Sequence, residues 1–120
     1  MNVILWICQV LLSAVFAVSG TLKSVQSKPR MVASGQTGVQ AYSLPFIRFI
    51  AASELLGAAG LILPRALHIA PALTPLAAAG LAVIMIGAAV SHARLHEPRS
   101  AAVNAVLFAL CVVVMLGRAS

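Results

Sequence analysis

The chain has 120 residues, of which 62% are hydrophobic and 8% are charged. Soluble domains are about half apolar and about a quarter charged, and a soluble fold of this length would expose large apolar patches. The composition therefore excludes an ordinary soluble domain and predicts a protein of the lipid bilayer. The net charge of +6 does not indicate nucleic-acid binding, because the basic residues lie almost entirely at the ends of apolar runs, as interfacial anchors do.

Apolar stretches in four places predict four transmembrane helices. They cover about residues 2–22, 45–63, 75–91 and 101–116, and each can cross roughly 30 Å of hydrocarbon at about 1.5 Å per residue. Helix is the expected state because lipid offers no hydrogen-bond partners to the backbone. Short links make successive helices antiparallel neighbours. We therefore expect an all-α fold, a four-transmembrane-helix antiparallel bundle that forms one domain over residues 1–120.

The first stretch contains no basic residue before Lys23. A cleaved signal peptide would carry a basic segment ahead of its apolar core, so we expect a helix that is retained. The connection that follows, residues 23–44, is too long for a simple link in so small a protein. We expect it to contain an interfacial or partly re-entrant helix around residues 30–42, between the first and second transmembrane helices.

The second stretch carries a glutamate, Glu54, close to the middle of the membrane. An ionised side chain at this depth costs about 2.5 to 3.5 kcal/mol on the insertion scale, so Glu54 should face protein and have a polar partner. Ile50, Gly57 and Leu61 share its helical stripe, and Gly57 permits close approach of another helix. Pro64 is expected to end this helix.

The other helices carry small and polar residues at spacings of three, four or seven. Membrane helices turn such stripes towards one another. The stripes are Gln9, Ser13, Phe16, Gly20 and Lys23 in the first helix, Gly80 and Gly87 in the third, and Asn104, Phe108, Cys111 and Met115 in the fourth.

The two cysteines, Cys8 and Cys111, lie inside apolar runs. The sequence has no C-x-x-C pair and no Cys/His spacing suited to zinc, so we expect no metal site. Cys8 lies about 100° around its helix from the polar stripe, which argues against a redox pair with Cys111. Both thiols are interpreted as small apolar fillers, and a redox role stays open.

The distribution of basic residues predicts the orientation of the bundle. The side of the first and third connections holds six basic residues, whereas the opposite side holds only Arg65 and Arg118. The positive-inside rule then places these two connections in the cytoplasm and both termini outside. The six residues are Lys23, Lys28, Arg30, Arg48, Arg94 and Arg99.

In this arrangement the unusual polar residues converge. Lys23, Arg48, His92 and Asn104 lie towards one membrane face, and Glu54 lies deeper. Lys23 or His92 is the expected partner of Glu54. Arg48 is a poorer partner because six residues on one helix separate the two by about 120°, and its side chain can reach the interface instead. These five residues form a predicted intramembrane polar site that either binds a ligand or is structural.

Several segments form a pattern that spans nearly the whole chain. They are residues 19–23 (SGTLK), 46–64 (FIRFIAASELLGAAGLILP), 75–82 (PLAAAGLA), 87–92 (GAAVSH) and Asn104. In combination they resemble the DoxX-like family. The resemblance implies a small protein of the bacterial inner membrane with a four-helix bundle. The family takes its name from a subunit linked to thiosulfate and quinone oxidation, and some relatives are associated with thiol-oxidative defence complexes at the membrane.

The residues themselves contain no haem-ligation pattern, nucleotide loop or nucleophile–base pair, so no catalytic residue is predicted. One interpretation is a membrane subunit or anchor that supports a redox protein partner and binds a quinone beside Glu54 and His92. A protonatable carboxylate near a basic group suits this role, because quinone reduction takes up protons as well as electrons. The alternatives are a non-catalytic scaffold or assembly protein, and a proton or small-molecule carrier that would require a homo-oligomer.

Overall fold

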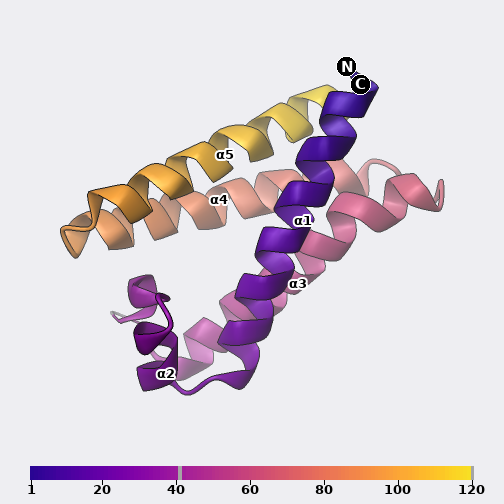
Figure 1. The fold of residues 1–120 in the computed structure, drawn as a ribbon. Coiled ribbons are helices and arrows are strands. Elements are labelled where there is room, and N and C mark those ends of the chain that lie inside the picture. Colours follow the sequence, from indigo (N-terminus) through magenta and orange to yellow (C-terminus); the bar gives the residue numbers. More distant parts are fainter. Residues whose placement is uncertain (41, 120) are drawn as a thin grey trace.

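The computed structural model of the protein describes residues 1–40 and 42–119, and this part of the chain is all-α (Figure 1). Four long helices, each apolar enough to cross a bilayer, confirm the four predicted transmembrane segments. Each extends a few residues beyond its expected bounds at one or both ends. They are α1 (Asn2–Val25), α3 (Leu44–Ala66), α4 (Leu73–Arg94) and α5 (Pro98–Arg118).

The connection between α1 and α3 differs from the single helix expected around residues 30–42. It contains a short helix, α2 (Lys28–Ala33), and a 3-10 turn, η1 (Thr37–Val39). Gly35, with φ +101°, separates the two, in a backbone conformation that glycine adopts far more readily than other residues. A small apolar cluster attaches the connection to the beginning of α3; it consists of Met31, Val39 and Ile47.

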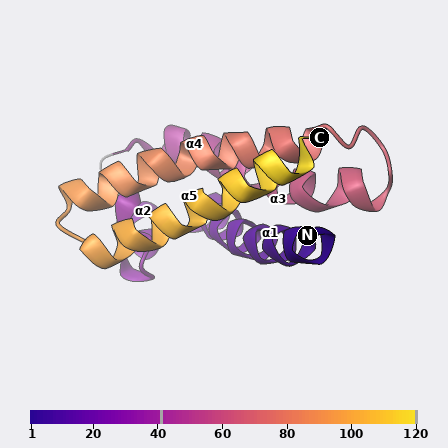
Figure 2. The ribbon, with the colours of Figure 1, turned by 90° about the horizontal axis from the view of Figure 1, so that it is seen from above.

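The long helices form two closely packed pairs. Helix α1 packs along α3, and α4 packs along α5, whereas the contacts between the pairs are fewer. Figures 1 and 2 show that the pairs meet at the end where the two chain termini lie. From there they diverge towards α2 and the turn between α4 and α5. The antiparallel bundle is therefore closed at one end and open at the other.

Close helix contacts in the closed half depend on a glycine. A Cβ atom added to Gly57 would lie 2.7 Å from the side chain of Leu81, so this leucine occupies the space that Gly57 leaves. The expected seam of Gly80 and Gly87 on α4 is wrong, because both are exposed and have no neighbouring atoms within 4 Å of an added Cβ. Helix α4 instead packs into the core through apolar side chains larger than glycine; they are Ala78, Leu81, Ala82 and Met85.

Pro64 does not end α3, which continues to Ala66. Proline has no N–H group, so it cannot donate a hydrogen bond to the carbonyl of Gly60 in the preceding turn. The hydroxyl of the fully buried Thr74 donates to this carbonyl at 2.9 Å. The prediction that Pro64 ends the helix is wrong because α4 supplies the hydrogen bond that the proline removes. The carbonyl of Gly60 therefore has a partner although its environment is apolar.

Candidate functional site

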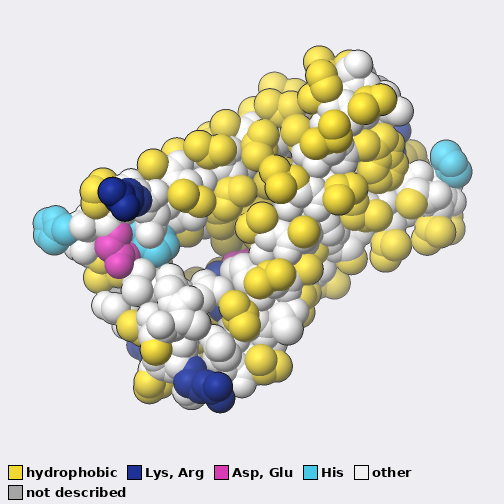
Figure 3. Space-filling view, viewed as in Figure 1, with side chains coloured by type: hydrophobic (Ala, Val, Ile, Leu, Met, Phe, Trp, Pro, Cys, Tyr) yellow, Lys and Arg dark blue, Asp and Glu magenta, His cyan; other side chains and the backbone are white. Residues whose placement is uncertain are grey.

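A cavity of about 490 Å³ lies between the diverging helix pairs. Figure 3 shows the molecule hollowed on this side. All four long helices and the connection contribute to its wall, which is mostly apolar. This size and composition are typical of small-molecule sites, which usually hold about 300 to 1,000 Å³ and a few placed polar groups. The polar residues of the wall are Ser19, Lys23, Gln36, Tyr42, Glu54, His92 and Asn104.

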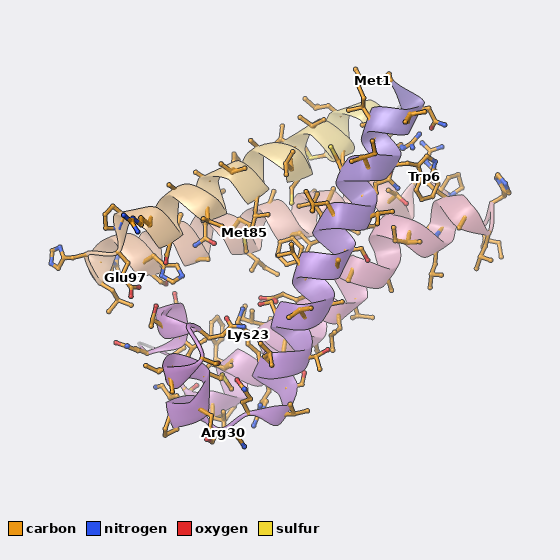
Figure 4. All side chains as sticks on the ribbon, in the orientation of Figure 1. Met1, Trp6, Lys23, Arg30, Met85 and Glu97 are labelled. Atoms are coloured by element: carbon orange, nitrogen blue, oxygen red, sulfur yellow. The ribbon has the colours of Figure 1, made fainter. Side chains whose placement is uncertain are left out.

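An ion pair joins α1 and α3 at the cavity. Lys23 Nζ lies 2.6 Å from Glu54 Oε1 and also donates to Ser19 Oγ at 2.9 Å. The antiparallel packing brings the last turn of α1, with Lys23, beside the first half of α3, and Lys23 lies where α1 borders the gap between the pairs (Figure 4). Glu54 is fully buried and the Lys23 side chain is 13% exposed. Glu54 thus has the interhelical basic partner that its depth predicts.

Arg48 does not contact Glu54. Its guanidinium group donates to the backbone carbonyl of Lys23. This carbonyl belongs to the last turn of α1, where acceptors lack partners within the helix. Arg48 therefore fixes the backbone that carries Lys23, and it does not line the cavity.

His92 lines the cavity but binds Glu97 instead of Glu54. His92 Nδ1 lies 2.8 Å from Glu97 Oε1, and the Thr37 hydroxyl donates to the same oxygen at 2.7 Å. The hydrogen bond from His92, followed by that from Thr37, lowers the pKa of Glu97 below its usual value. Glu97 lies in the turn between α4 and α5, on the side of the connection (Figure 4). It therefore links the connection to the α4–α5 pair.

A second hydrogen bond also links the connection to the α4–α5 pair. Tyr42 Oη lies 2.7 Å from Ser91 Oγ, and the Ser91 hydroxyl donates to the carbonyl of Gly87. Tyr42 is therefore the donor to Ser91. We call these two links, Tyr42–Ser91 and the contacts of Glu97 with Thr37 and His92, the polar clasp.

Sequence reasoning missed Glu97, although a signal was present. The chain has only two acidic residues, Glu54 and Glu97. In a chain with eight lysines and arginines, each scarce carboxylate is a strong candidate for a specific partner. Tyr42 and Ser91 carried no comparable signal, because hydroxyl groups are common at helix ends.

Polar atoms without partners face the apolar interior. Glu54 Oε2 and Asn104 Nδ2 are buried and have no hydrogen-bond partner among the described residues. Asn104 lies on α5 at the cavity wall and is 8% exposed. Four of the predicted residues therefore share one cavity, and two of them present an unused acceptor and an unused donor. An unpaired buried polar group is unfavourable by about 1 to 3 kcal/mol, so these atoms favour a polar ligand.

The two cysteines lie outside this site. Cys8 and Cys111 are buried free thiols in the apolar core, and neither lines the cavity. Within residues 1–40 and 42–119, no group of three or more His, Cys, Asp or Glu side chains lies close enough together to hold a metal ion.

Comparison with known proteins identifies the family of the chain. No curated protein and no solved structure matches the chain. The model of the DoxX-like family matches residues 7–114, which include α3 and α4, most of α1 and α5, and every polar residue of the cavity wall. The chain therefore belongs to the DoxX-like family.

Proposed function

We propose that this multi-pass membrane protein is a subunit or anchor that binds a quinone-like molecule in its cavity and supports a redox protein partner. The proposal places it in the inner membrane of a bacterium, with the polar clasp on the cytoplasmic side. The observation that carries it is the pair of unpartnered polar atoms, Glu54 Oε2 and Asn104 Nδ2, in an otherwise apolar cavity.

The chemistry of the wall fits a quinone headgroup. A quinone combines a flat apolar ring with carbonyl oxygens that accept hydrogen bonds. Asn104 Nδ2 is an unused donor, and the Lys23 ammonium group has a third N–H beyond those bound to Glu54 and Ser19. The apolar wall, including Val15, Phe16 and Met85, suits the ring and the isoprenoid chain that quinones carry.

Reduction of a quinone to a quinol adds two electrons and two protons. In this proposal the partner protein supplies the electrons, and the chain supplies the route for protons. The Lys23 side chain is 13% exposed, whereas Glu54 is fully buried. The pair therefore extends from the partly hydrated edge of the cavity, which we call its rim, into the interior. A carboxyl and an amine in direct contact can pass a proton to a ligand oxygen and regain it from the rim.

The second candidate is a structural scaffold, and a specific observation favours it. Lys23 and Glu54 join α1 and α3, which already pack closely: a Cβ atom on Gly20 would lie 2.9 Å from Leu55. An ion pair between two such helices can fix their register without binding anything. In that case the cavity would hold lipid.

Replacement of Glu54 by glutamine separates the two candidates. Glu54→Gln keeps the shape and removes the charge and the exchangeable proton. We expect the variant to accumulate in the membrane at near-normal levels, to retain less quinone on purification in mild detergent, and to fail to complement a deletion strain under oxidative or thiol stress.

The matched control is Arg94→Gln, which removes an exposed charged side chain of α4 from a position outside the cavity wall and outside the polar clasp. We expect this variant to retain quinone at the wild-type level. Normal quinone content and normal complementation by Glu54→Gln would favour the scaffold and contradict the proposed site.

A further inference from the structure

A second polar cluster lies at the closed end of the bundle, away from the cavity. Arg118, at the end of α5, is only 9% exposed. Its Nε donates to Gln9 Oε1 at 2.7 Å and its Nη1 donates to Asn2 Oδ1 at 2.7 Å, both on α1. Arg65, in the last turn of α3, donates through Nη2 to the carbonyl of Arg118 at 3.2 Å. Two guanidinium groups thus converge where three helices end.

The charge of this cluster is not balanced by an acidic side chain. The only acidic residues of the chain, Glu54 and Glu97, bind Lys23 and His92 at the cavity. Among the described residues, the acceptors bonded to Arg65 and Arg118 are neutral amide or carbonyl oxygens. The helix C-termini contribute partial negative charge, but they do not supply a counterion.

Donors of both arginines remain unused. Among the described residues, Arg118 Nη2 and Arg65 Nε are buried and have no hydrogen-bond partner. Hydrogen bonds from guanidinium N–H groups to phosphate oxygens are strong, so an unpaired buried nitrogen on each of two arginines suits a phosphate group. The cluster therefore has the charge and the free donors of an anion site.

An apolar groove leads away from this cluster along α1. It is lined by Asn2, Val3, Trp6, Ile7, Val10 and Leu11. Two contacts of Arg118 belong to the groove: Asn2 accepts its hydrogen bond, and the Trp6 ring lies 5.5 Å from its guanidinium carbon. The remaining lining residues are exposed apolar side chains of a transmembrane helix, which face lipid.

The position of Trp6 fixes the depth of the cluster. Trp6 lies near the N-terminal end of α1 (Figure 4). Tryptophan is enriched at the boundary between headgroups and hydrocarbon, where its N–H meets water and its ring meets lipid. We therefore expect Arg118, which lies beside the Trp6 ring, at the level of lipid phosphates, and the groove at the level of acyl chains.

We propose that Arg65, Arg118 and the α1 groove form a binding site for an anionic phospholipid. The phosphate group binds at the two guanidinium groups, and one acyl chain lies in the groove. A soluble phosphate ion would satisfy the arginines but leave the groove uncovered, whereas a zwitterionic lipid would add its own positive charge beside two others. The site is independent of the cavity and of the quinone proposal.

The chain contains its own reporter for this site, since Trp6 is the only tryptophan. The full chain is placed in phosphatidylcholine vesicles, and a small fraction of the lipid is replaced by phosphatidylglycerol or phosphatidylcholine with brominated acyl chains, which quench tryptophan fluorescence on contact. We expect the brominated phosphatidylglycerol to quench Trp6 at lower mole fraction than brominated phosphatidylcholine. The preference should be about fivefold if one arginine binds the phosphate and about thirtyfold if both do, at roughly 1 kcal/mol each.

Matched variants assign the preference to the cluster. Arg118→Gln and Arg65→Gln should each reduce it, and the double variant should abolish it. Arg99→Gln, which removes an exposed arginine near the start of α5 at the open end, should retain it. Equal quenching of the wild-type protein by the two brominated lipids would overturn the proposal, and this comparison stands even if a variant fails to insert.

Two further outcomes also contradict the proposal. The first is a preference that persists in the Arg65→Gln/Arg118→Gln protein. The second is loss of the wild-type preference on addition of millimolar inorganic phosphate, which would identify the site as one for a free anion.

Discussion

The closed and open ends of the bundle are held together by different kinds of contact. At the closed end, helices interlock directly: Leu81 fills the space beside Gly57, and Thr74 hydrogen-bonds the backbone of Gly60. At the open end, the helix pairs diverge around a cavity, and the polar clasp links them. A hydrogen bond contributes only about 1 kcal/mol net, so the clasp opens at a lower free energy than the interlocked end. A ligand-binding cavity needs one end that opens at a lower free energy, because the ligand must be able to enter.

The largest expected difference between the two ends is the compartment that each faces. The excess of basic residues at the open end predicts that it lies in the cytoplasm and that both termini lie outside. Alkaline phosphatase fused after residue 120 should therefore be active, and a reporter that works only in the cytoplasm should be silent there. The same reporters fused after Gly35, in the connection, should give the reverse result. Cytoplasmic activity at the C-terminal fusion would reverse the assignment of the ends.

The next largest effect is expected from a substitution that tests the packing of α3 against α4 in the closed half. Gly57→Leu would force a side chain into the space that Leu81 occupies, and we expect the free energy of unfolding to fall by about 1 to 3 kcal/mol. The control is Gly80→Ala on the lipid-exposed face of α4, where an added Cβ meets no atom within 4 Å. This change should stabilise the protein by about 0.5 to 1 kcal/mol, because alanine favours helix.

Reversible unfolding in mixed micelles measures both glycine variants. If Gly57→Leu were as stable as the wild-type protein, α3 and α4 would not be interlocked as described, and the contrast between the ends would disappear.

The smallest effect concerns the pH dependence of the polar clasp. The hydrogen bonds from His92 and Thr37 lower the pKa of Glu97 in the folded protein. The contribution of Glu97 to the clasp is therefore fully present above the pKa of an unperturbed glutamate, about 4.3, and is lost as the pH falls through the lower folded value. The effect should be modest, because the Glu97 side chain is 32% exposed and solvent screens its interactions.

Hydrogen–deuterium exchange of the connection measures this change. After correction for intrinsic rates, protection of the α2 and η1 amides should decrease on acidification from pH 5 to pH 3, whereas α3 and α4 in the closed half should stay protected. In Glu97→Gln the protection of the connection should not vary over this range. A pH-independent connection in the wild-type protein would show that Glu97 does not hold the clasp.

The features that could be predicted from the sequence have local physical causes. An apolar stretch that matches the bilayer specifies a transmembrane helix whatever its neighbours are. The high free energy of a carboxylate in hydrocarbon required Glu54 to face another helix, and Lys23 was one of the two partners expected for it. The functional role of this pair stays a prediction.

The features that could not be predicted depend on tertiary contacts. Pro64 has a strong local tendency to end a helix, and only the arrival of Thr74 from α4 offsets it. The expected seam of Gly80 and Gly87 fails because α4 packs through larger residues: Gly80 is exposed, and Gly87 lines the cavity instead of meeting another helix. His92 was the other partner expected for Glu54, but Glu97, in the turn after α4, lies 2.8 Å from His92 and binds it instead.

The hydrogen bond from Thr74 to Gly60 has a consequence for the biogenesis of the protein. An isolated α3 would enter the membrane with the carbonyl of Gly60 unsatisfied, because Pro64 cannot bond to it. The partner for this carbonyl arrives only with the beginning of α4, across a link that runs from Leu67 to Ala72. Helices α3 and α4 therefore complete each other's hydrogen bonds, and we expect insertion of the two as one helical hairpin to be favoured over two successive insertions.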